Sequence, residues 1–246
     1  MSGSTGGRGP ATLEEATVLQ SEVLEDLRTA VNHLDWVTSL TEPWLGDDPL
    51  EIGSGLGDAA ARWAATGRPL TVSEADPGRL AELRERFAEH PTVQVRELAV
   101  PIRESGNYSA VVSLNVLEHI EDDVAALRDF ARLVRPGGRI VLVVPAFEQA
   151  MSNFDREIGH FRRYRVRSME ATLRAAGLRP IKVTYLNSLG LFGWLVFVKL
   201  LRGRPGEGLP LKIYDKLIVP VLRRVEARIR VPFGQSVLAV AETPGS

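Results

Sequence analysis

The chain has 246 residues, of which 44% are hydrophobic and 25% are charged, and its 30 basic and 31 acidic side chains leave a formal net charge of −1. This size fits one α/β domain with an appended element, and the near balance of charge gives no reason to expect a nucleic-acid partner, which usually leaves a strongly basic footprint. The chain has no cysteine, which excludes disulfides, thiolate metal sites and cysteine nucleophiles.

The first residues are rich in Gly and Ser and lack the apolar core of a signal peptide, so we expect a disordered start over 1–11 and a cytoplasmic protein. From Thr12 to Leu40, apolar residues recur at spacings of three and four, which predicts a helix with one apolar stripe that includes Ala30. Pro43 and the turn that follows it end this helix. Residues 12–45 are therefore expected to form an N-terminal helical cap.

From Leu50 onward, short apolar strands alternate with helix-like stretches, and this alternation predicts βαβ units in a mostly parallel sheet that is covered on both faces. The expected fold class is therefore α/β. Two late strands flank a long insertion. The predicted strands are 50–52, 70–73, 93–95, 110–114, 139–144, 181–186 and 236–242, and the two clearest helices are 77–89 and 122–133.

A glycine-rich turn, with Gly53, Gly55 and Gly57, follows the first strand and opens a helix. Glycines at such a place let the backbone turn sharply and bring a ligand against main-chain N–H groups. A dinucleotide fingerprint that starts at Gly53 requires Gly or Ala at position 58, where the chain has Asp58, and no Lys-Ser/Thr pair follows as in a P-loop. A plain structural turn remains the alternative to a ligand-binding loop.

The second strand ends with an acidic residue, Glu74, about 20 residues beyond the glycine turn, where related folds place the carboxylate that accepts ribose hydroxyls. Asp76 is predicted to cap the next helix. The alternative is that both acids are merely solvated residues at a helix start.

Four segments in this order resemble those of the class I S-adenosylmethionine (SAM)-dependent methyltransferases over about Leu50 to Pro145. The resemblance implies a Rossmann-like, seven-stranded sheet that is parallel except for an antiparallel last strand, flanked by helices, with SAM across the carboxyl ends of the strands. The four segments are Glu51–Gly57, Glu74–Pro77, Val112–Ile120 and Leu133–Gly138.

The same resemblance implies roles in cofactor binding. The glycines of the turn would approach the methionine portion of SAM, Glu74 would hold the ribose, and Asn115 would flank the amino-acid tail. Glu97 and Leu98 are the nearest candidates for the adenine site, although the sequence after them departs from the usual pattern. The cofactor-binding set is Glu51, Gly53, Gly55, Gly57, Glu74, Ala75, Glu97, Leu98, Asn115 and Val116.

Two histidines are candidate general bases, because an imidazole titrates near neutral pH. His119 follows the fourth strand, and its alternative role is that of a structural hydrogen-bonding residue near the cofactor. His160 follows the fifth strand, with Asp155 as a candidate to orient it; the alternative is that His160 caps a surface helix. The four histidines show no pairing at metal-ligand spacing, and no carboxylate/histidine cluster is apparent, so we expect no metal site.

The residues after His160 are predicted to bind the acceptor. Arg162 and Arg163 suit a phosphate or carboxylate in fork geometry, with Tyr164 beside them; the alternative is that both arginines lie in water. Methyltransferases with a similar Gly-His-x-Arg-Arg-Tyr segment occur among enzymes of glycan, glycolipid and natural-product pathways, and this family analogy constrains the substrate only weakly.

The insertion over 187–232 is predicted to form a helical lid. Residues 189–201 are densely apolar but fall short of the ~20 residues that span a bilayer. Residues 211–230 look helical, with a basic side and an apolar side, and are broken by Pro220. Besides a lid, the open alternatives are a homodimer surface, a peripheral contact of 189–230 with anionic lipid, and a helix pair that packs on the sheet.

The expected function is SAM-dependent methyl transfer to a small molecule, with an oxygen atom of a natural-product, sugar or lipid-linked acceptor aligned for in-line displacement. N- or C-methylation, a non-catalytic SAM-binding partner protein and a dehydrogenase are the alternatives. No Asn/Asp-Pro-Pro-Tyr/Phe motif follows the fourth strand, which weighs against methylation of a nitrogen in nucleic acid or protein. The oligomeric state, monomer or homodimer, is left open.

Overall fold

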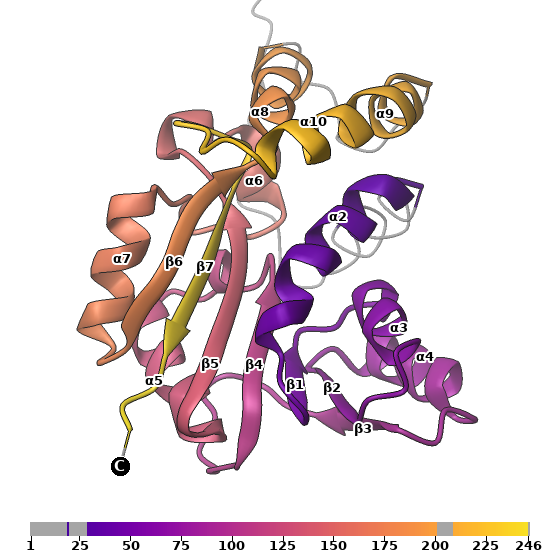
Figure 1. Ribbon diagram of the computed structural model, residues 1–246, viewed down its shortest axis with the longest axis vertical. Helices are drawn as coiled ribbons and strands as arrows, with labels where there is room; N and C mark the ends of the chain where they lie inside the picture. Colours follow the sequence, from indigo (N-terminus) through magenta and orange to yellow (C-terminus); the bar gives the residue numbers. More distant parts are fainter. Residues whose placement is uncertain (1–18, 20–28, 201–208, 246) are drawn as a thin grey trace, which may run out of the picture.

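A seven-stranded sheet with the order β3-β2-β1-β4-β5-β7-β6 forms the centre of the protein, with helices on both faces (Figure 1). The structure is a computed structural model that describes residues 19, 29–200 and 209–245. Strands β1 to β5 are parallel, and β7 is antiparallel to both of its neighbours, which confirms the predicted topology. The strands are β1 (Pro49–Ile52), β2 (Leu70–Glu74), β3 (Val93–Glu97), β4 (Tyr108–Leu114), β5 (Val134–Pro145), β6 (Arg179–Leu186) and β7 (Ser236–Glu242).

Each face of the sheet is covered by its own apolar core. Val111 of β4 packs in one core and Val112 in the other, because successive side chains of a strand point to opposite faces. Burial on both faces explains why these strands are apolar without a gap. Helices α5 (Asp123–Leu133) and α7 (Val166–Ala175) cover the first face, and α2 (Val31–Thr41), α3 (Asp58–Ala64) and α4 (Pro77–Phe87) cover the second.

The predicted N-terminal helix is interrupted before Val31: Leu19 is helical, but Thr29 and Ala30 are not. Ala30 lies outside α2, which starts at Val31, so the single helix expected through this position is wrong here. The helix ends at Thr41 and is followed by the 3₁₀ turn η1 (Glu42–Trp44), as Pro43 indicates. The expected disordered start, and all of the predicted helix before Thr29 except Leu19, lie outside the described residues.

A carboxylate from the insertion explains this helix start. Asp215, which is 2% exposed, accepts hydrogen bonds from the backbone N–H groups of Asn32 (3.1 Å) and His33 (2.8 Å) and from the Asn32 side chain (2.9 Å). The first amides of a helix have no partner within it and carry the positive end of its dipole, so a buried acid at this point stabilises a new helix start.

The insertion lies with α2 over the carboxyl ends of the parallel strands (Figure 1). Glu226 of α10 accepts hydrogen bonds from the backbone N–H groups of Asn187 and Ser188 (2.9 Å each) and so caps α8. Pro220 lies in the first turn of α10, where proline is tolerated, and it divides the predicted helix. The elements are α8 (Ser188–Gly193), the π-helical η4 (Trp194–Leu200), α9 (Leu209–Ile213), the π-helical η5 (Tyr214–Ile218) and α10 (Val219–Glu226).

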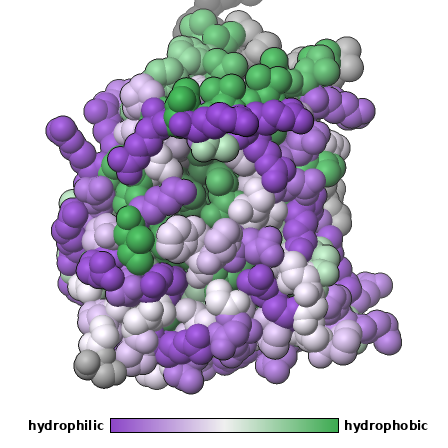
Figure 2. Space-filling view, viewed as in Figure 1, coloured by the Kyte–Doolittle hydropathy of each residue, from purple (hydrophilic) through white to green (hydrophobic). Residues whose placement is uncertain are grey.

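Much of the insertion's apolar surface faces outward, where Figure 2 shows hydrophobic side chains gathered over α8, α9 and α10. Its buried side packs on α2 and α6, not on the sheet: Val219 and Leu222 contact Trp36, and Val198 contacts Phe154. Within the described residues, no helix combines the length and the apolar character needed to cross a membrane. The exposed apolar residues are Leu189, Phe192, Val196, Leu200, Ile213, Leu217, Val221, Val225 and Ile229.

Replacing the distant cap should loosen both segments that it joins. We expect Asp215→Ala to lower the free energy of unfolding by about 2 kcal/mol, the upper range for the loss of a helix cap, and to speed amide hydrogen exchange at Asn32 and His33. Glu82→Ala, on the exposed side of α4, is the matched control. Unchanged exchange at both amides in Asp215→Ala would show that α2 begins at Val31 for another reason.

Candidate active site

The glycine turn between β1 and α3 has a backbone that only glycine fits. Gly53, Gly55 and Gly57 have φ values of 71°, 56° and 79°, in the left-handed region that other residues rarely adopt. A Cβ atom on Gly53 would lie 2.5 Å from a methyl carbon of Val116, and one on Gly57 would lie 2.8 Å from the Phe87 ring. The turn is therefore closely packed at the carboxyl edge of the sheet, with Gly53 half-buried and Gly55 and Gly57 buried.

The carboxylate of Glu74, which is predicted to hold a ribose, is hydrogen-bonded to this turn. Glu74 is 5% exposed, and its Oε2 accepts a hydrogen bond from the backbone N–H of Gly55 (2.9 Å). Its Oε1 accepts from the backbone N–H groups of Ala75 (2.9 Å) and Asp76 (3.0 Å). Asp76 caps α4 by accepting from the Arg79 amide (2.9 Å), which confirms the cap predicted from the sequence.

The adenine candidates lie beside this acid. Glu97 is aligned with Glu74 across the β2–β3 pair, and the Leu98 amide donates to the Glu74 carbonyl (3.3 Å). Glu97 is exposed and Leu98 is half-buried, so together they present one polar and one apolar side chain next to the ribose candidate.

Glu51 places an unpartnered carboxylate oxygen at the end of β1. Its side chain is buried, and its Oε2 has no hydrogen-bond partner among the described residues. Burial raises the pKa of Glu51 to about 7; a hydrogen bond from Ser54 opposes this shift, and the charges of Glu74 and Asp58 add to it. A buried acid with one unpartnered oxygen, next to the glycine turn, fits a ligand that carries a positive charge.

Asn115 ends β4 in a left-handed conformation (φ 54°), exposed at the same edge. Its amide donates to the Val143 carbonyl (2.8 Å), which fixes the turn, and asparagine tolerates this conformation better than most residues. The half-buried Val116 then packs against Gly53, as the distance above shows. The fourth strand therefore delivers the residues after it directly beside the glycine turn.

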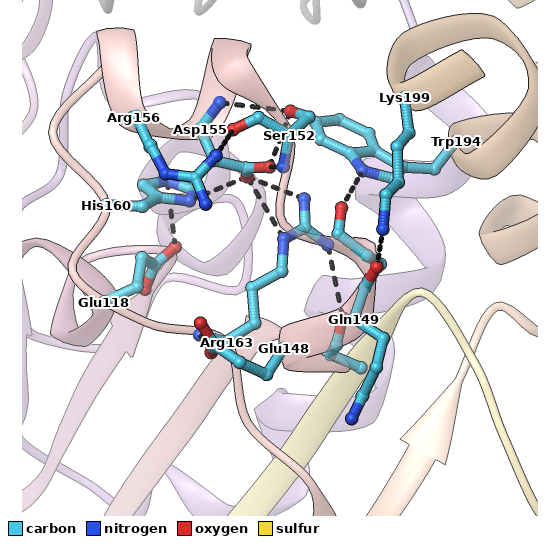
Figure 3. Close-up of polar contacts among 12 residues, drawn as sticks. Glu118, Glu148, Gln149, Ser152, Asp155, Arg156, His160, Arg163, Trp194 and Lys199 are labelled. Atoms are coloured by element: carbon cyan, nitrogen blue, oxygen red, sulfur yellow. Dashed lines mark hydrogen bonds and ion pairs between the residues drawn. The ribbon is translucent and has the colours of Figure 1, made fainter.

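The segment after β5 is organised around the fully buried carboxylate of Asp155, in α6 (Asn153–Glu157) (Figure 3). Asp155 accepts from the Ser152 amide (2.6 Å) and from Nη2 of Arg163 (2.7 Å), and its Oδ1 lies 2.9 Å from Nδ1 of His160. Burial would raise the pKa of Asp155, but hydrogen bonds from His160 and Arg163 outweigh it and hold the pKa below its usual range. Asp155 therefore orients His160, as expected, and the side chain of His160, 8% exposed, is no surface cap.

His160 and the end of β4 meet because the two backbones are joined. The Phe161 amide donates to the Glu118 carbonyl (2.9 Å). Nε2 of His160 lies 3.9 Å from Oε1 of Glu118, and the ring centroids of His119 and His160 are 4.5 Å apart. The expectation that no carboxylate/histidine cluster exists is therefore wrong: the fold brings together Glu118, His119 and His160, which the sequence keeps apart.

The environments of His119 and Glu118 shift their titration. Burial, followed by repulsion from His160, lowers the pKa of His119 to about 4, and hydrogen bonds to the backbone of Gly159 and Ile158 oppose this. Burial raises the pKa of Glu118 to about 7, against the attraction of His160 and Arg163. His119 is thus neutral at pH 7 and a weak base, which favours His160 as the residue that takes up a proton.

The three predicted acceptor ligands bond to the protein itself. Nη1 of Arg162 donates to the Ile120 carbonyl (2.7 Å), and the Tyr164 hydroxyl donates to Asp123 (2.8 Å). Burial and the charge of Asp123 raise the pKa of Tyr164 above its usual range. Arg163 is buried on Asp155, so the alternative in which it lies in water is wrong. As acceptor ligands, all three stay predictions.

Comparison with known proteins points to one class of enzyme. Residues 50–140 match the family model described as a methyltransferase domain. The chain is 32% identical over 110 residues to the ubiquinone biosynthesis O-methyltransferase of Albidiferax ferrireducens, a match that covers 43% of this chain and 43% of that relative. It is 27% identical over 179 residues to the enzyme of the same name from Ralstonia nicotianae, covering 65% of this chain and 74% of that relative. The chain thus spans less than half of the first relative's length.

Solved structures share the fold at low identity. A geranyl diphosphate methyltransferase in complex with SAM is 17% identical, with a TM-score of 0.60, over 95% of this chain and 92% of that one. The [4+2]-cyclase SpnF is 16% identical, with a TM-score of 0.60, over 98% of this chain and 100% of that one. These likenesses show the fold alone, and the second is described as a cyclase.

The buried acid at the end of β1 should give the protein a measurable pH dependence. The folded protein holds the Glu51 proton more tightly than the unfolded chain, so this contribution to stability is complete below pH 4.5 and is lost as pH rises through 7. We expect Glu51→Gln to become more stable than the wild type across this window, by on the order of 3 kcal/mol at pH 8.

Chemical denaturation between pH 4 and pH 8 measures this difference, with Glu82→Gln as the control. A difference between Glu51→Gln and the wild type that stays constant with pH would contradict the raised pKa.

Proposed function

Since the chain belongs to the class I SAM-dependent methyltransferases, we propose that it transfers a methyl group from SAM to an oxygen atom of a small organic acceptor. One observation carries this proposal: the glycine turn fastened to Glu74 and the buried His160–Asp155 pair lie at the same edge of the sheet, joined through Val116 and the residues after it. A donor site and a proton acceptor are the two parts that such a transfer needs.

The chain's own residues fit SAM at the first part. When bound, SAM supplies an electrophilic methyl group on a sulfonium centre. Glu74 would hold the ribose hydroxyls, with Glu97 and Leu98 toward the adenine, because these side chains are adjacent across β2 and β3. The glycine backbone of the turn and the exposed Asn115 would hold the methionine portion. The unpartnered oxygen of Glu51 lies nearby and would carry a negative charge when ionised.

At the second part, the residues after β5 hold a base in one orientation. Asp155 fixes Nδ1 of His160, which leaves Nε2 to take the proton from an acceptor hydroxyl. Arg163 keeps Asp155 ionised, so Asp155 can hold the imidazole ring through Nδ1. The rest of the catalytic task is alignment of the acceptor oxygen with the methyl group, which the edge of the sheet provides by placing both sites together.

The acceptor is proposed to be a natural-product, sugar or lipid-linked hydroxyl compound. Two curated relatives are named O-methyltransferases of ubiquinone biosynthesis, which favours oxygen over nitrogen or carbon. The insertion over the site exposes apolar side chains and carries basic ones, including Lys216, Arg223 and Arg224, which suits an apolar acceptor with an anionic group. The proposal also includes a lid function for 187–232, a peripheral membrane contact and a cytoplasmic location. It leaves the oligomeric state open between monomer and homodimer.

Calorimetric titration tests the donor site. We expect the wild type to bind SAM in the micromolar range and not to bind NADH, and Glu74→Gln to weaken SAM binding by roughly 10- to 100-fold, since charge-assisted hydrogen bonds contribute about 1.5–3 kcal/mol. Glu82→Gln should bind like the wild type. SAM affinity that is equal in Glu74→Gln and the wild type would show that another acid holds the ribose.

Turnover tests the base. With labelled SAM and a panel of phenols, hydroxy acids and hydroxylated amphiphiles, we expect an O-methylated product by mass spectrometry. On the fastest acceptor, His160→Gln should lower kcat by roughly 10²- to 10⁴-fold while the Kd for SAM changes less than about twofold. An N- or C-methylated product, or full turnover by His160→Gln, would contradict this assignment.

A further inference from the structure

Three side chains at the edge of the sheet each bring one metal-ligating atom into the same small region. A carboxylate oxygen of Glu118 and one ring nitrogen each of His119 and His160 all lie within 4.8 Å of one another. Two of these residues come from the 3₁₀ turn η2 (Leu117–His119) after β4, and the third follows α6. The bond between the Phe161 amide and the Glu118 carbonyl (2.9 Å) holds the two segments in place, so the cluster is a fixed product of the fold.

The carboxylate of Glu118 in this cluster has no hydrogen-bond partner among the described residues. Glu118 is fully buried, and neither of its oxygen atoms has a hydrogen-bond partner among the described residues. Nε2 of His160 lies 3.9 Å from one of these oxygens, an ion-pair contact that Figure 3 marks with a dashed line. Burial of a carboxylate that lacks hydrogen bonds is costly, and a bound cation would offset that cost.

The outer contacts of the two histidines are those of metal ligands. Nδ1 of His160 lies 2.9 Å from Asp155, whose carboxylate is held in turn by Arg163 and Ser152. His119 is hydrogen-bonded to the backbone of Gly159 and Ile158 and is neutral at pH 7. Histidines that bind metal almost always use their second nitrogen on a carboxylate or a carbonyl, which fixes the ring and leaves the other nitrogen for the ion.

We propose that Glu118, His119 and His160 bind a divalent transition-metal ion of the Zn²⁺ class, with Asp155 as the outer partner of His160. Two imidazoles and one carboxylate form a known three-ligand set for catalytic zinc, which leaves a coordination position open. In a tetrahedral site with bonds of about 2.1 Å, ligand atoms lie about 3.4 Å apart. The 3.9 Å between Glu118 and His160 must therefore close by about 0.5 Å, and the other pairs, which lie within 4.8 Å, by up to about 1.4 Å.

Metal binding itself does not depend on the proposed reaction, but its use does. If the chain methylates an oxygen atom as proposed, the ion would replace His160 as the group that promotes proton loss, because Nε2 would then be a metal ligand. A hydroxyl at the open position would lose its proton to water more readily than a free one, since coordination lowers the pKa of a bound oxygen acid. The cluster reaches the glycine turn through Val116, whose side chain packs on Gly53. The metal would thus lie on the acceptor side of the site.

Spectroscopy with Co²⁺ tests the site without any acceptor. The full chain, treated with a chelator and then titrated with Co²⁺, should develop visible ligand-field absorption that saturates at a single ion per chain and disappears when Zn²⁺ is added. Glu118→Gln and His160→Gln should weaken Co²⁺ binding by at least about 100-fold, and Asp155→Asn by roughly 10- to 100-fold, as expected for an outer partner. His90→Gln and Glu82→Gln, outside the cluster, should bind like the wild type.

Thermal unfolding distinguishes a variant that has lost metal binding from one that fails to fold. The melting temperature of the wild type should rise when Zn²⁺ is added, and that of Glu118→Gln should not, although the metal-free variant should be at least as stable as the metal-free wild type because it no longer buries an unpaired charge. Absence of saturable Co²⁺ absorption in the wild type, or equal Co²⁺ affinity in wild type and Glu118→Gln, would overturn the proposal. SAM titration of the same metal-free samples judges the proposed function separately.

Discussion

The fully buried carboxylate of Asp155 is the interaction on which the acceptor side of the site depends. It holds the start of α6 through Ser152, the guanidinium of Arg163 and the ring of His160 at once, and all three groups are buried. Arg163 also lies over the ring of Trp194, 4.4 Å from its centroid, so the same carboxylate couples the insertion to the site. Replacing one member of this set by an apolar residue leaves the others uncompensated, and such losses are costly.

Buried acids play the same part elsewhere in the molecule. Asp215 and Glu226 each accept the free amides of a helix start that is distant in sequence, and Glu74 accepts amides of the glycine turn. In each case a carboxylate meets the positive end of oriented N–H groups, which stabilises it, and Glu74 is also paired with Arg79 at 3.4 Å. Glu118 differs from these acids because neither of its oxygens has a hydrogen-bond partner among the described residues, and Glu51 keeps one oxygen unpartnered. The fold thus separates acids that organise the backbone from acids that remain available to a ligand.

The strands, the glycine turn with its acid and the cap at Asp76 could be predicted because they depend on local periodicity and on spacing within one βαβ unit, whereas the antiparallel last strand followed from the resemblance to the methyltransferases. The start of α2 could not, because it is set by Asp215, far away in the chain. The cluster around Glu118 could not be predicted from the sequence for the same reason, because His119 and His160 meet only when two strand ends lie side by side. The arginines after His160 are predicted to bind the acceptor on the basis of composition alone. Composition does not indicate that Arg163 forms a buried ion pair with Asp155.

The central claim is that donor and acceptor groups share one edge of the sheet, and a crystal structure with S-adenosylhomocysteine tests it most directly. The account predicts that the ribose lies on Glu74, that the amino-acid tail lies along the glycine turn near Asn115, and that the sulfur atom faces the side of His119 and His160. A nucleoside bound away from Glu74, or a sulfur atom that points away from both histidines, would contradict it.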